Sequence, residues 1–426
     1  MKYKSKFISP AVFKKSMSRL ILLLAFTHFA VSTFSQTLDT FLKRAYSNNP
    51  ELKALEMEYK GEVQKSEQVA YLPDPLVGVG FPMLRPETRL GSQVFSISAS
   101  QMFPWFGTLK TKKDIVFTMS KAKYESINAA KLNIDFQIKT AYFKLYLLQG
   151  KQNLIKKNIR IFETLENVAN VMVESGKSIA SDVLLIRMKI AELKNNILIL
   201  DEEKKKYYAT INNLTYSNPD ENIAIDSVDI NLADLNYNFD SLREKIQKLH
   251  PLIRQIDFQI EKSKQEIELN SYSSRPSFGL GFDYSIVNPR TDATPANNGR
   301  DILIPKIMFT LPIYRKKYEA KDEEEKIHQK AFEYRKENIV NNMITDIRIY
   351  ESDYEDSKLK FQLAKSQIEL SKSAYNILLT EYSSSGNRFD DLIKLESEIN
   401  KLELDQWDAI IQSHLTKFKI EKLVSY

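Results

Sequence analysis

The chain has 426 residues and no cysteine, and its 61 basic and 55 acidic side chains give a formal net charge of +6. The lack of cysteine excludes disulfides, thiolate metal sites, cysteine nucleophiles and a lipid-modified amino-terminal cysteine. With 21 Tyr, 23 Phe, 11 Gly and 14 Pro, the composition favours long helices and aromatic-rich segments over disorder.

Residues 1–35 have the pattern of a secretory signal peptide. Six basic residues and no acid precede the apolar run LILLLAFTHFAVSTF. The run is short for a membrane-spanning helix, so we expect cleavage after Ser35, with an uncleaved anchor as the alternative. The remaining chain holds 55 residues of each charge. We therefore predict no polyanion-binding surface and no nucleic-acid partner.

The first repeat, residues 36–215, begins with a short helix that has Pro50 in its first turn, where a missing N–H costs nothing. Two strands are predicted next, at about 75–82 and 92–101. Both alternate apolar side chains with Gly or Ser, which is typical of a strand between lipid and a watery lumen. A half-buried sheet in a soluble protein looks similar and stays open as an alternative. The residues predicted to face lipid are Val77, Val79 and Phe81.

The second half of this repeat is predicted to be a long helical hairpin at 108–215. Proline is absent between Trp105 and Asn218, and Gly176 marks the tip, placed near 174–181. Trp105 follows Pro104 just after the strands. We predict that its indole lies at the membrane–water interface, with ordinary packing as the alternative.

After an inter-repeat segment at 216–240, expected to join the middle of the helical part, residues 241–426 repeat the same order. Residues 47–81 align without gaps to residues 248–282 at a constant offset of 201, which indicates a duplicated unit. The strands of this repeat are predicted at about 276–287 and 301–311. The residues predicted to face lipid here are Phe278, Leu280 and Phe282.

The hairpin of the second repeat is predicted at 315–424, with its tip near 383–389 at Gly386. Its first helix carries two apolar stripes with a period of seven, displaced by about 200°. Such a helix suits a place between neighbours on both flanks, as in a wall or cylinder of helices. An ordinary bundle core remains the alternative. The stripes are Phe361, Ile368 and Tyr375, and Leu363, Leu370 and Ile377.

Chemical motifs are missing from the sequence. His250, His328 and His414 are far apart and have no paired metal-ligand spacing, and the alternating glycines at 78, 80, 279 and 281 form no phosphate loop. The acidic run KDEEEK at 321–326 is expected to be a solvated helix face. We therefore predict no catalytic residue, no cofactor and no metal site, and a protein that is not an enzyme.

The predicted strands also constrain the assembly. Four strands cannot close a membrane barrel, for which about eight is the usual minimum. Open strand edges are not tolerated in lipid. If the strands span a membrane, several subunits must share one barrel.

Over about residues 37–424 the chain resembles the TolC-like outer membrane efflux protein family. The resemblance is carried by NNPELKALE, PDPLVGVGF, VESGKSIASDVL, LPIYRKK and YSSSGNRFDDLIKLE, while SQMFPWFGTLK is similar to the branch paired with heavy-metal-cation RND pumps. It implies a mainly α fold with a transmembrane β part. Each of two tandem repeats would hold a short helix, a β-hairpin and a long coiled-coil helical hairpin. A homotrimer would form a 12-stranded β-barrel continuous with a periplasmic α-barrel.

The resemblance also implies a function. The protein would be the outer membrane channel of a tripartite efflux or type I secretion system in a Gram-negative bacterium. It would passively conduct substrates from a periplasmic adaptor and an inner-membrane pump, of RND type. The alternatives are a periplasmic or surface coiled-coil interaction protein without channel activity and, with only export in its favour, a degradative surface enzyme.

The same resemblance assigns roles to the hairpin ends. Asp182, with Asp390 or Asp391 in the second repeat, would line the periplasmic aperture, although an aspartate there can also be a helix N-cap. For Gly176 and Gly386, the alternative to contact with an adaptor is a role as turn formers alone. The residues implied to contact the adaptor are Gly176, Lys177, Ser178, Gly386, Asn387 and Arg388.

Overall fold

The computed structural model of the protein describes residues 37–225, 230–235 and 237–424. The predicted signal peptide lies outside the described residues. The first repeat contains α2 (Leu38–Asn48), α3 (Pro50–Gln68), β1 (Leu76–Gly80), β2 (Glu87–Thr88), β3 (Gly91–Phe103), α4 (Thr108–Glu174) and α5 (Ala180–Thr215). The second contains α6 (Phe239–Leu249), α7 (Pro251–Ser273), β4 (Ser277–Asn288), β5 (Ile302–Thr310), α8 (Lys316–Ser385) and α9 (Phe389–Val424).

The two repeats match element by element. Helices α2 and α6 start 201 residues apart, as do α3 and α7, and α5 and α9 each have 36 residues. The predicted two-repeat arrangement of short helices, strands and long hairpins is therefore confirmed.

Each repeat begins with two short helices, whereas the sequence predicts only the one after the proline. The side chain of Asn49 accepts hydrogen bonds from the N–H groups of Glu51 and Leu52 at 3.0 and 3.2 Å, which caps α3. In the second repeat Nδ1 of His250 accepts from the N–H of Leu252 at 3.3 Å. Helices α2 and α6, of 11 residues each, are not among the sequence predictions.

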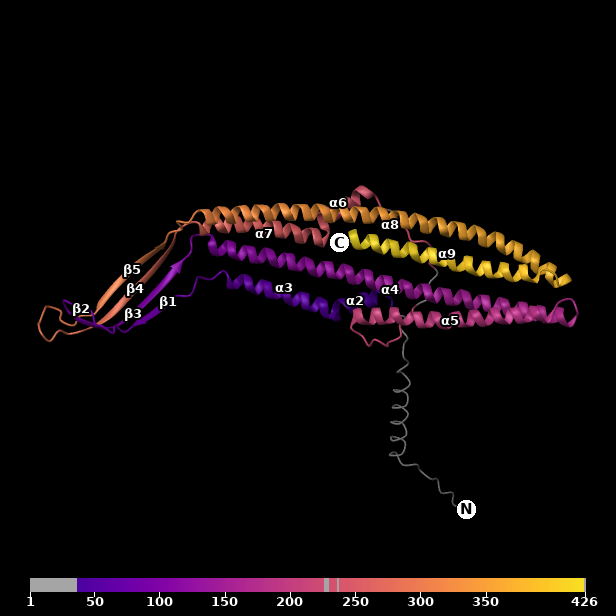
Figure 1. Ribbon diagram of the computed structural model, residues 1–426, viewed down its shortest axis with the longest axis horizontal. Helices are drawn as coiled ribbons and strands as arrows, with labels where there is room; N and C mark the ends of the chain where they lie inside the picture. Colours follow the sequence, from indigo (N-terminus) through magenta and orange to yellow (C-terminus); the bar gives the residue numbers. More distant parts are fainter. Residues whose placement is uncertain (1–36, 226–229, 236, 425–426) are drawn as a thin grey trace, which may run out of the picture.

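The helices form one layer that runs along the long axis of the molecule (Figure 1). At 67 and 70 residues, α4 and α8 are the long rods, and 70 residues of α-helix span about 105 Å. The shorter helices share the remaining rows, with α3 and α5 on one side of α4 and α7 and α9 between α4 and α8 (Figure 1). The order across the layer is therefore α3–α4–α7–α8 near the sheet and α5–α4–α9–α8 near the tips.

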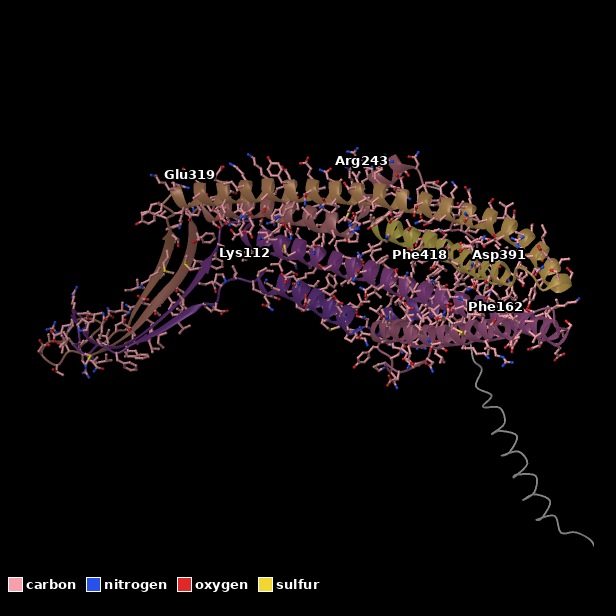
Figure 2. All side chains as sticks on the ribbon, turned by 45° about the vertical axis from the view of Figure 1, so that its right-hand side comes forward. Lys112, Phe162, Arg243, Glu319, Asp391 and Phe418 are labelled. Atoms are coloured by element: carbon pink, nitrogen blue, oxygen red, sulfur yellow. The ribbon has the colours of Figure 1, made fainter. Side chains whose placement is uncertain are left out.

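The apolar core consists of separate clusters between adjacent rods. The cluster nearest the tips joins α4, α5, α8 and α9, and Phe162 lies within it (Figure 2). Its fully buried side chains include Phe162, Ile186, Tyr382 and Leu392. Burial of a large apolar side chain contributes about 1.5–3 kcal/mol, so these contacts hold the two hairpins against each other. Within the described part of the chain, no helix is long and apolar enough to cross a membrane.

The strands form one antiparallel sheet at the opposite end of the molecule from the hairpin tips (Figure 1). The order is β1–β3–β4–β5, and the central pairing of β3 with β4 joins the two repeats. The short strand β2 pairs with the outer end of β3. Among the described residues, β1 and β5 each pair with one strand, so both outer edges of the sheet expose unpaired backbone groups.

Candidate functional site

The sheet has two chemically different faces. Directly opposed residues share a face, and the register places Val77 opposite Ala99, Ala99 opposite Phe282, and Phe282 opposite Pro305. The other apolar residues of this face are Val79, Phe95, Ile97, Phe103, Phe278, Leu280, Tyr284, Ile286, Leu303, Ile307 and Phe309, and Gln101, opposite Leu280, is polar.

Five of the six residues predicted to face lipid are exposed on this apolar face or at the end of its strand. Val77, Val79, Phe81, Leu280 and Phe282 all have large exposed fractions. The sixth, Phe278, is half-buried because its ring stacks on Phe103 at 5.4 Å between ring centroids and lies 6.1 Å from Phe106.

The opposite face is built mostly from Gly and Ser. Gly78 and Gly80 of β1 oppose Ser98 and Ser96 of β3, and a Cβ atom on Gly281 would lie 2.7 Å from the carbonyl oxygen of Ala99. Small side chains leave the space in front of this face open. Strand β5 departs from the pattern and contributes Ile302, Ile304 and Met308 to it.

An aromatic cluster lies where the sheet meets the helices. The guanidinium carbon of Arg275 is 5.5 Å from the ring centroid of Trp105, and Trp105 lies 6.2 Å from Phe106. Large apolar residues around this junction are exposed, which suits the boundary between an apolar and an aqueous phase. They are Tyr71, Leu72, Phe106, Leu311, Ile313 and Tyr314.

At the other end of the molecule, the two hairpin tips contact each other. The turns have left-handed glycines, Gly176 with φ 71° and Gly386 with φ 74°. A Cβ atom on Gly386 would lie 1.9 Å from the carbonyl oxygen of Lys177, whereas one on Gly176 would meet nothing within 4 Å. Nζ of Lys177 also donates to the carbonyl oxygen of Ser384 at 3.3 Å. Gly386 is thus required by close packing as well as by turn geometry.

Asp182, the first of the aspartates predicted to line the aperture, lies inside this contact. The side chain of Asp182 is 7% exposed, and its carboxylate accepts a hydrogen bond from the hydroxyl of Ser178. The hydroxyl of Ser178 lies 3.4 Å from that of Tyr382, which is fully buried at the end of α8. Burial raises the pKa of Tyr382, so this phenol stays neutral and can donate.

The second-repeat aspartates are exposed near the tip, where Figure 2 labels Asp391. Asp391 accepts a hydrogen bond from Nε of Arg388 at 3.0 Å, and Arg388 also lies 3.6 Å from Glu381. Asp182 and Asp391 are each the third residue of their helix. Asp391, rather than Asp390, is therefore the structural equivalent of Asp182.

One of the two apolar stripes of α8 has no partner among the described residues. Ile368 is 7% exposed, and Tyr375 of the same stripe packs against the apolar cluster nearest the tips. Leu363, Leu370 and Ile377 are 59%, 70% and 68% exposed on the outer edge of the layer. The opposite edge is similar, because α5 exposes Leu184, Met188, Leu198 and Ile199.

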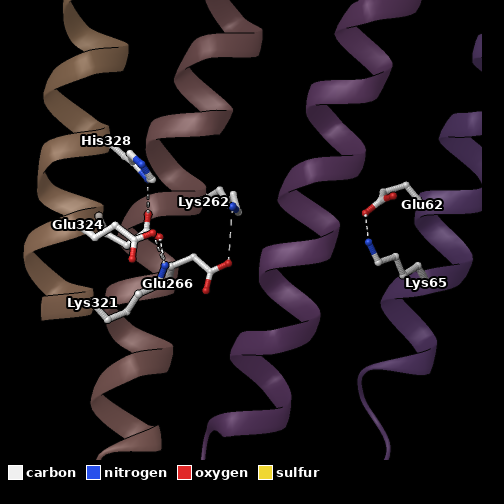
Figure 3. Close-up of polar contacts among 8 residues, drawn as sticks. Glu62, Lys65, Lys262, Glu266, Lys321, Glu324 and His328 are labelled. Atoms are coloured by element: carbon white, nitrogen blue, oxygen red, sulfur yellow. Dashed lines mark hydrogen bonds and ion pairs between the residues drawn. The ribbon is translucent and has the colours of Figure 1, made fainter. Parts of the chain in front are cut away.

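One cluster of potential metal ligands occurs on α8. Carboxylate oxygens of Glu324 and Glu325 and a ring nitrogen of His328 lie within 4.8 Å of one another. Lys321 occupies the same space, with Nζ 3.0 Å from Glu324 and 2.6 Å from Glu325 (Figure 3). Burial alone would raise the pKa of Glu325, but the hydrogen bonds from Lys321 and Ser263, together with the charges of Lys321 and Lys262, outweigh it and hold that pKa low. We interpret the group as an ion-pair cluster, and Glu325, buried against α7, departs from the solvated face predicted for 321–326.

Two features of the site are missed by the sequence predictions. Tyr382 reaches across from α8 to the turn of the first hairpin, and Lys306 pairs with Asp283 across the small-residue face of the sheet. The only sequence signal for the second pair is a lone lysine in an otherwise apolar strand.

No protein-family profile matches the chain, and no curated protein matches it. Solved structures do match. The chain is similar to CusC, with a TM-score of 0.74 and 14% identity, covering 92% of each chain. It is similar to the outer-membrane channel OprN, with a TM-score of 0.70 and 14% identity over 91% of this chain and 89% of that one. It also matches the outer membrane protein VceC of Vibrio cholerae, with a TM-score of 0.69 and 12% identity over 91% of this chain and 95% of that one.

At these identities the likeness is one of fold. The fold is that of TolC-family channels, mainly helical with long hairpins and short strands in two repeats, and the predicted fold class is confirmed. CusC represents the heavy-metal branch, but OprN and VceC match about as well, so the fold does not distinguish the branch.

Proposed function

We propose that this chain is one subunit of a homotrimeric outer membrane channel, the exit conduit of a tripartite efflux system. The observation that carries the proposal is a sheet with one apolar face, one small-residue face and two unpaired edges, continuous with a helical layer whose two edges are also apolar and unpaired.

The edges of the sheet support a shared barrel. An unpaired N–H or C=O group in lipid costs several kcal/mol, so β1 of one subunit would pair with β5 of the next. Three copies of β1, β3, β4 and β5 give 12 strands, which exceeds the usual minimum for a closed membrane barrel. The apolar face then contacts lipid and the small-residue face surrounds the lumen. Trp105 and the exposed aromatic residues near it would lie where the outer membrane meets the water of the periplasm.

The helical layer supports the same assembly. In three copies, the Leu363–Leu370–Ile377 stripe of α8 would pack against α5 of the next subunit, and the part of α8 nearer the sheet against α3. The wall would then close into a cylinder of helices in the periplasm that continues the lumen of the barrel. Apolar side chains that are more than half exposed in the single chain would be buried there, at about 25 cal/mol for each Å² of apolar surface removed from water.

The hairpin tips would then lie farthest from the membrane. Gly176, Lys177, Ser178, Gly386, Asn387 and Arg388 would dock a periplasmic adaptor, and the adaptor would link the channel to an inner-membrane pump of RND type. Asp182 and Asp391 would line the aperture, with Asp390 beside them. The conduit itself would be passive and would carry out no catalysis.

Detergent extraction tests the proposal. Outer membranes containing the full chain should release it only with detergent, and light scattering should give the mass of three chains. Reconstituted into planar bilayers, the trimer should form conducting pores. A detergent-independent monomer would refute the channel and favour a coiled-coil interaction protein.

A further inference from the structure

Charged side chains are rare on the strands of the sheet. In β1, β3, β4 and β5 only Asp283 and Lys306 are charged. Nζ of Lys306 forms an ion pair with the carboxylate of Asp283. A strand with polar residues on its inner face can use Ser or Thr, so a charged pair here calls for its own explanation.

The pair lies on the small-residue face. Asp283 opposes Ser98, and Lys306 opposes Gly281. Ser98 in turn opposes Gly78. These neighbours on β1, β3 and β4 have short side chains or none, so the charged groups project further than the surface on that side. On β5, Ile304 lies opposite Asp283 and flanks Lys306. Both side chains stay accessible, with exposed fractions of 26% for Asp283 and 46% for Lys306.

The pair also lies near mid-height of the sheet. Asp283 is the seventh of the 12 residues of β4, and Lys306 is the fifth of the nine residues of β5. Rings of like charge at a narrow level of a pore set its ion selectivity, because the low-dielectric wall concentrates their field. A carboxylate beside each ammonium would cancel that field.

We propose that Asp283 and Lys306 form a zwitterionic ring in the barrel lumen, neutral overall, that keeps the barrel part of the conduit open to solutes of either sign. This inference rests on the proposed channel. Three subunits would place three carboxylates and three ammonium groups at one level. Each charge alone would make the barrel selective, and the pairing removes the selectivity.

Ion selectivity in planar bilayers tests the ring. Under a salt gradient, Asp283→Asn leaves three unpaired ammonium groups and should shift the cation/anion permeability ratio several-fold toward anions. Lys306→Gln leaves three carboxylates and should shift it by a similar factor toward cations. The double variant, and the exchanged variant Asp283→Lys with Lys306→Asp, should both return to the wild-type ratio.

Thiol modification is a second test of the ring, for the case that one of the charge variants assembles poorly. Because the chain has no cysteine, Lys306→Cys provides a unique thiol, and a charged, membrane-impermeant methanethiosulfonate should modify it and change the current. Leu280→Cys, on the apolar face, should not respond. Pores whose permeability ratio is the same in both single variants, or shifts in the same direction, would overturn the ring while leaving the channel standing. Failure of the wild-type protein to conduct would overturn the channel and the ring with it.

Discussion

The hydroxyl oxygens of Tyr382 and Ser178 lie 3.4 Å apart, although the two residues are 204 positions apart in the chain. Their contact connects the ends of the two hairpins. The hydroxyl of Ser178 in turn donates a hydrogen bond to the carboxylate of Asp182. The tip of the molecule is thus held by a short chain of polar groups around a fully buried tyrosine.

Removing this link should favour separation of the tips. Tyr382→Phe deletes one hydrogen bond per subunit, worth about 1 kcal/mol, and should raise the ratio of open to closed tips by about fivefold for each subunit. Single-channel recording measures it directly. Tyr334→Phe removes the hydroxyl of an exposed tyrosine on the same helix and serves as the control. Equal open probabilities in wild type and Tyr382→Phe would argue against a holding contact.

The two structurally equivalent aspartates should differ in their effect on conduction. Asp391 is exposed and Asp182 is enclosed by Ser178. Asp391→Asn should therefore raise single-channel conductance or weaken block by divalent cations more than Asp182→Asn does. Asp390→Asn is the matched control, one position away on the same helix turn. A larger response from Asp390 than from Asp391 would reverse the assignment of the pore-lining acid.

Stability should depend on pH through Glu396. This carboxyl on α9 is 2% exposed and accepts a hydrogen bond from Asn158 of α4 at 2.9 Å. Burial and the nearby Glu403 raise its pKa to about 7, against the lowering effects of Asn158, Lys157 and Lys372. Tyr375 of α8 also faces it.

The sign follows from the direction of that shift. The folded protein binds the proton of Glu396 more tightly than the unfolded chain does. The stabilisation that this proton contributes is therefore complete below pH 4.5 and is lost as pH rises through 7. Glu396→Gln should therefore gain up to about 3 kcal/mol per subunit relative to wild type between pH 5 and 8. Thermal melts across that range test it, with the exposed Glu398→Gln as control. A Tm difference that is constant with pH would contradict the prediction.

The exposed stripe of α8 should control assembly. Leu370→Glu would bury a charge in each of three interfaces of the proposed trimer, at a cost of several kcal/mol per site. The trimer should dissociate in detergent, as measured by light scattering. Lys365→Glu changes an exposed position of the same helix outside the stripe and should leave the mass unchanged. Intact trimers of Leu370→Glu would place the interface elsewhere.

The two faces of the sheet should differ in their accessibility to water-soluble and lipid-soluble thiol reagents. In single-cysteine variants of this cysteine-free chain, Ser98→Cys should react with a water-soluble maleimide in the assembled channel. Phe282→Cys should react only with a lipid-soluble reagent. Equal labelling of both by the water-soluble reagent would indicate a sheet that lies in water on both sides.

Local chemistry made much of this architecture predictable. Alternation around Gly78 and Gly279 marks strands because side chains on a strand have a period of two. The absence of proline and the left-handed glycines Gly176 and Gly386 mark the helical hairpins because both act on the backbone within a few residues. The repeat itself is visible in the sequence because both copies keep these local signals in the same order.

Contacts between distant segments were decided only by the tertiary structure. The sequence shows two stripes on α8, but only packing reveals that the one with Ile368 is buried and the one with Leu370 is free. Likewise, the sequence predicts Asp182 as an acid lining the aperture, whereas in the structure it is buried beside Ser178 and Tyr382. The partner of Lys306 is known only from the pairing of β5 with β4, which brings it to Asp283. Such contacts depend on register and helix rotation, which the folded chain sets by burying its apolar surface as a whole.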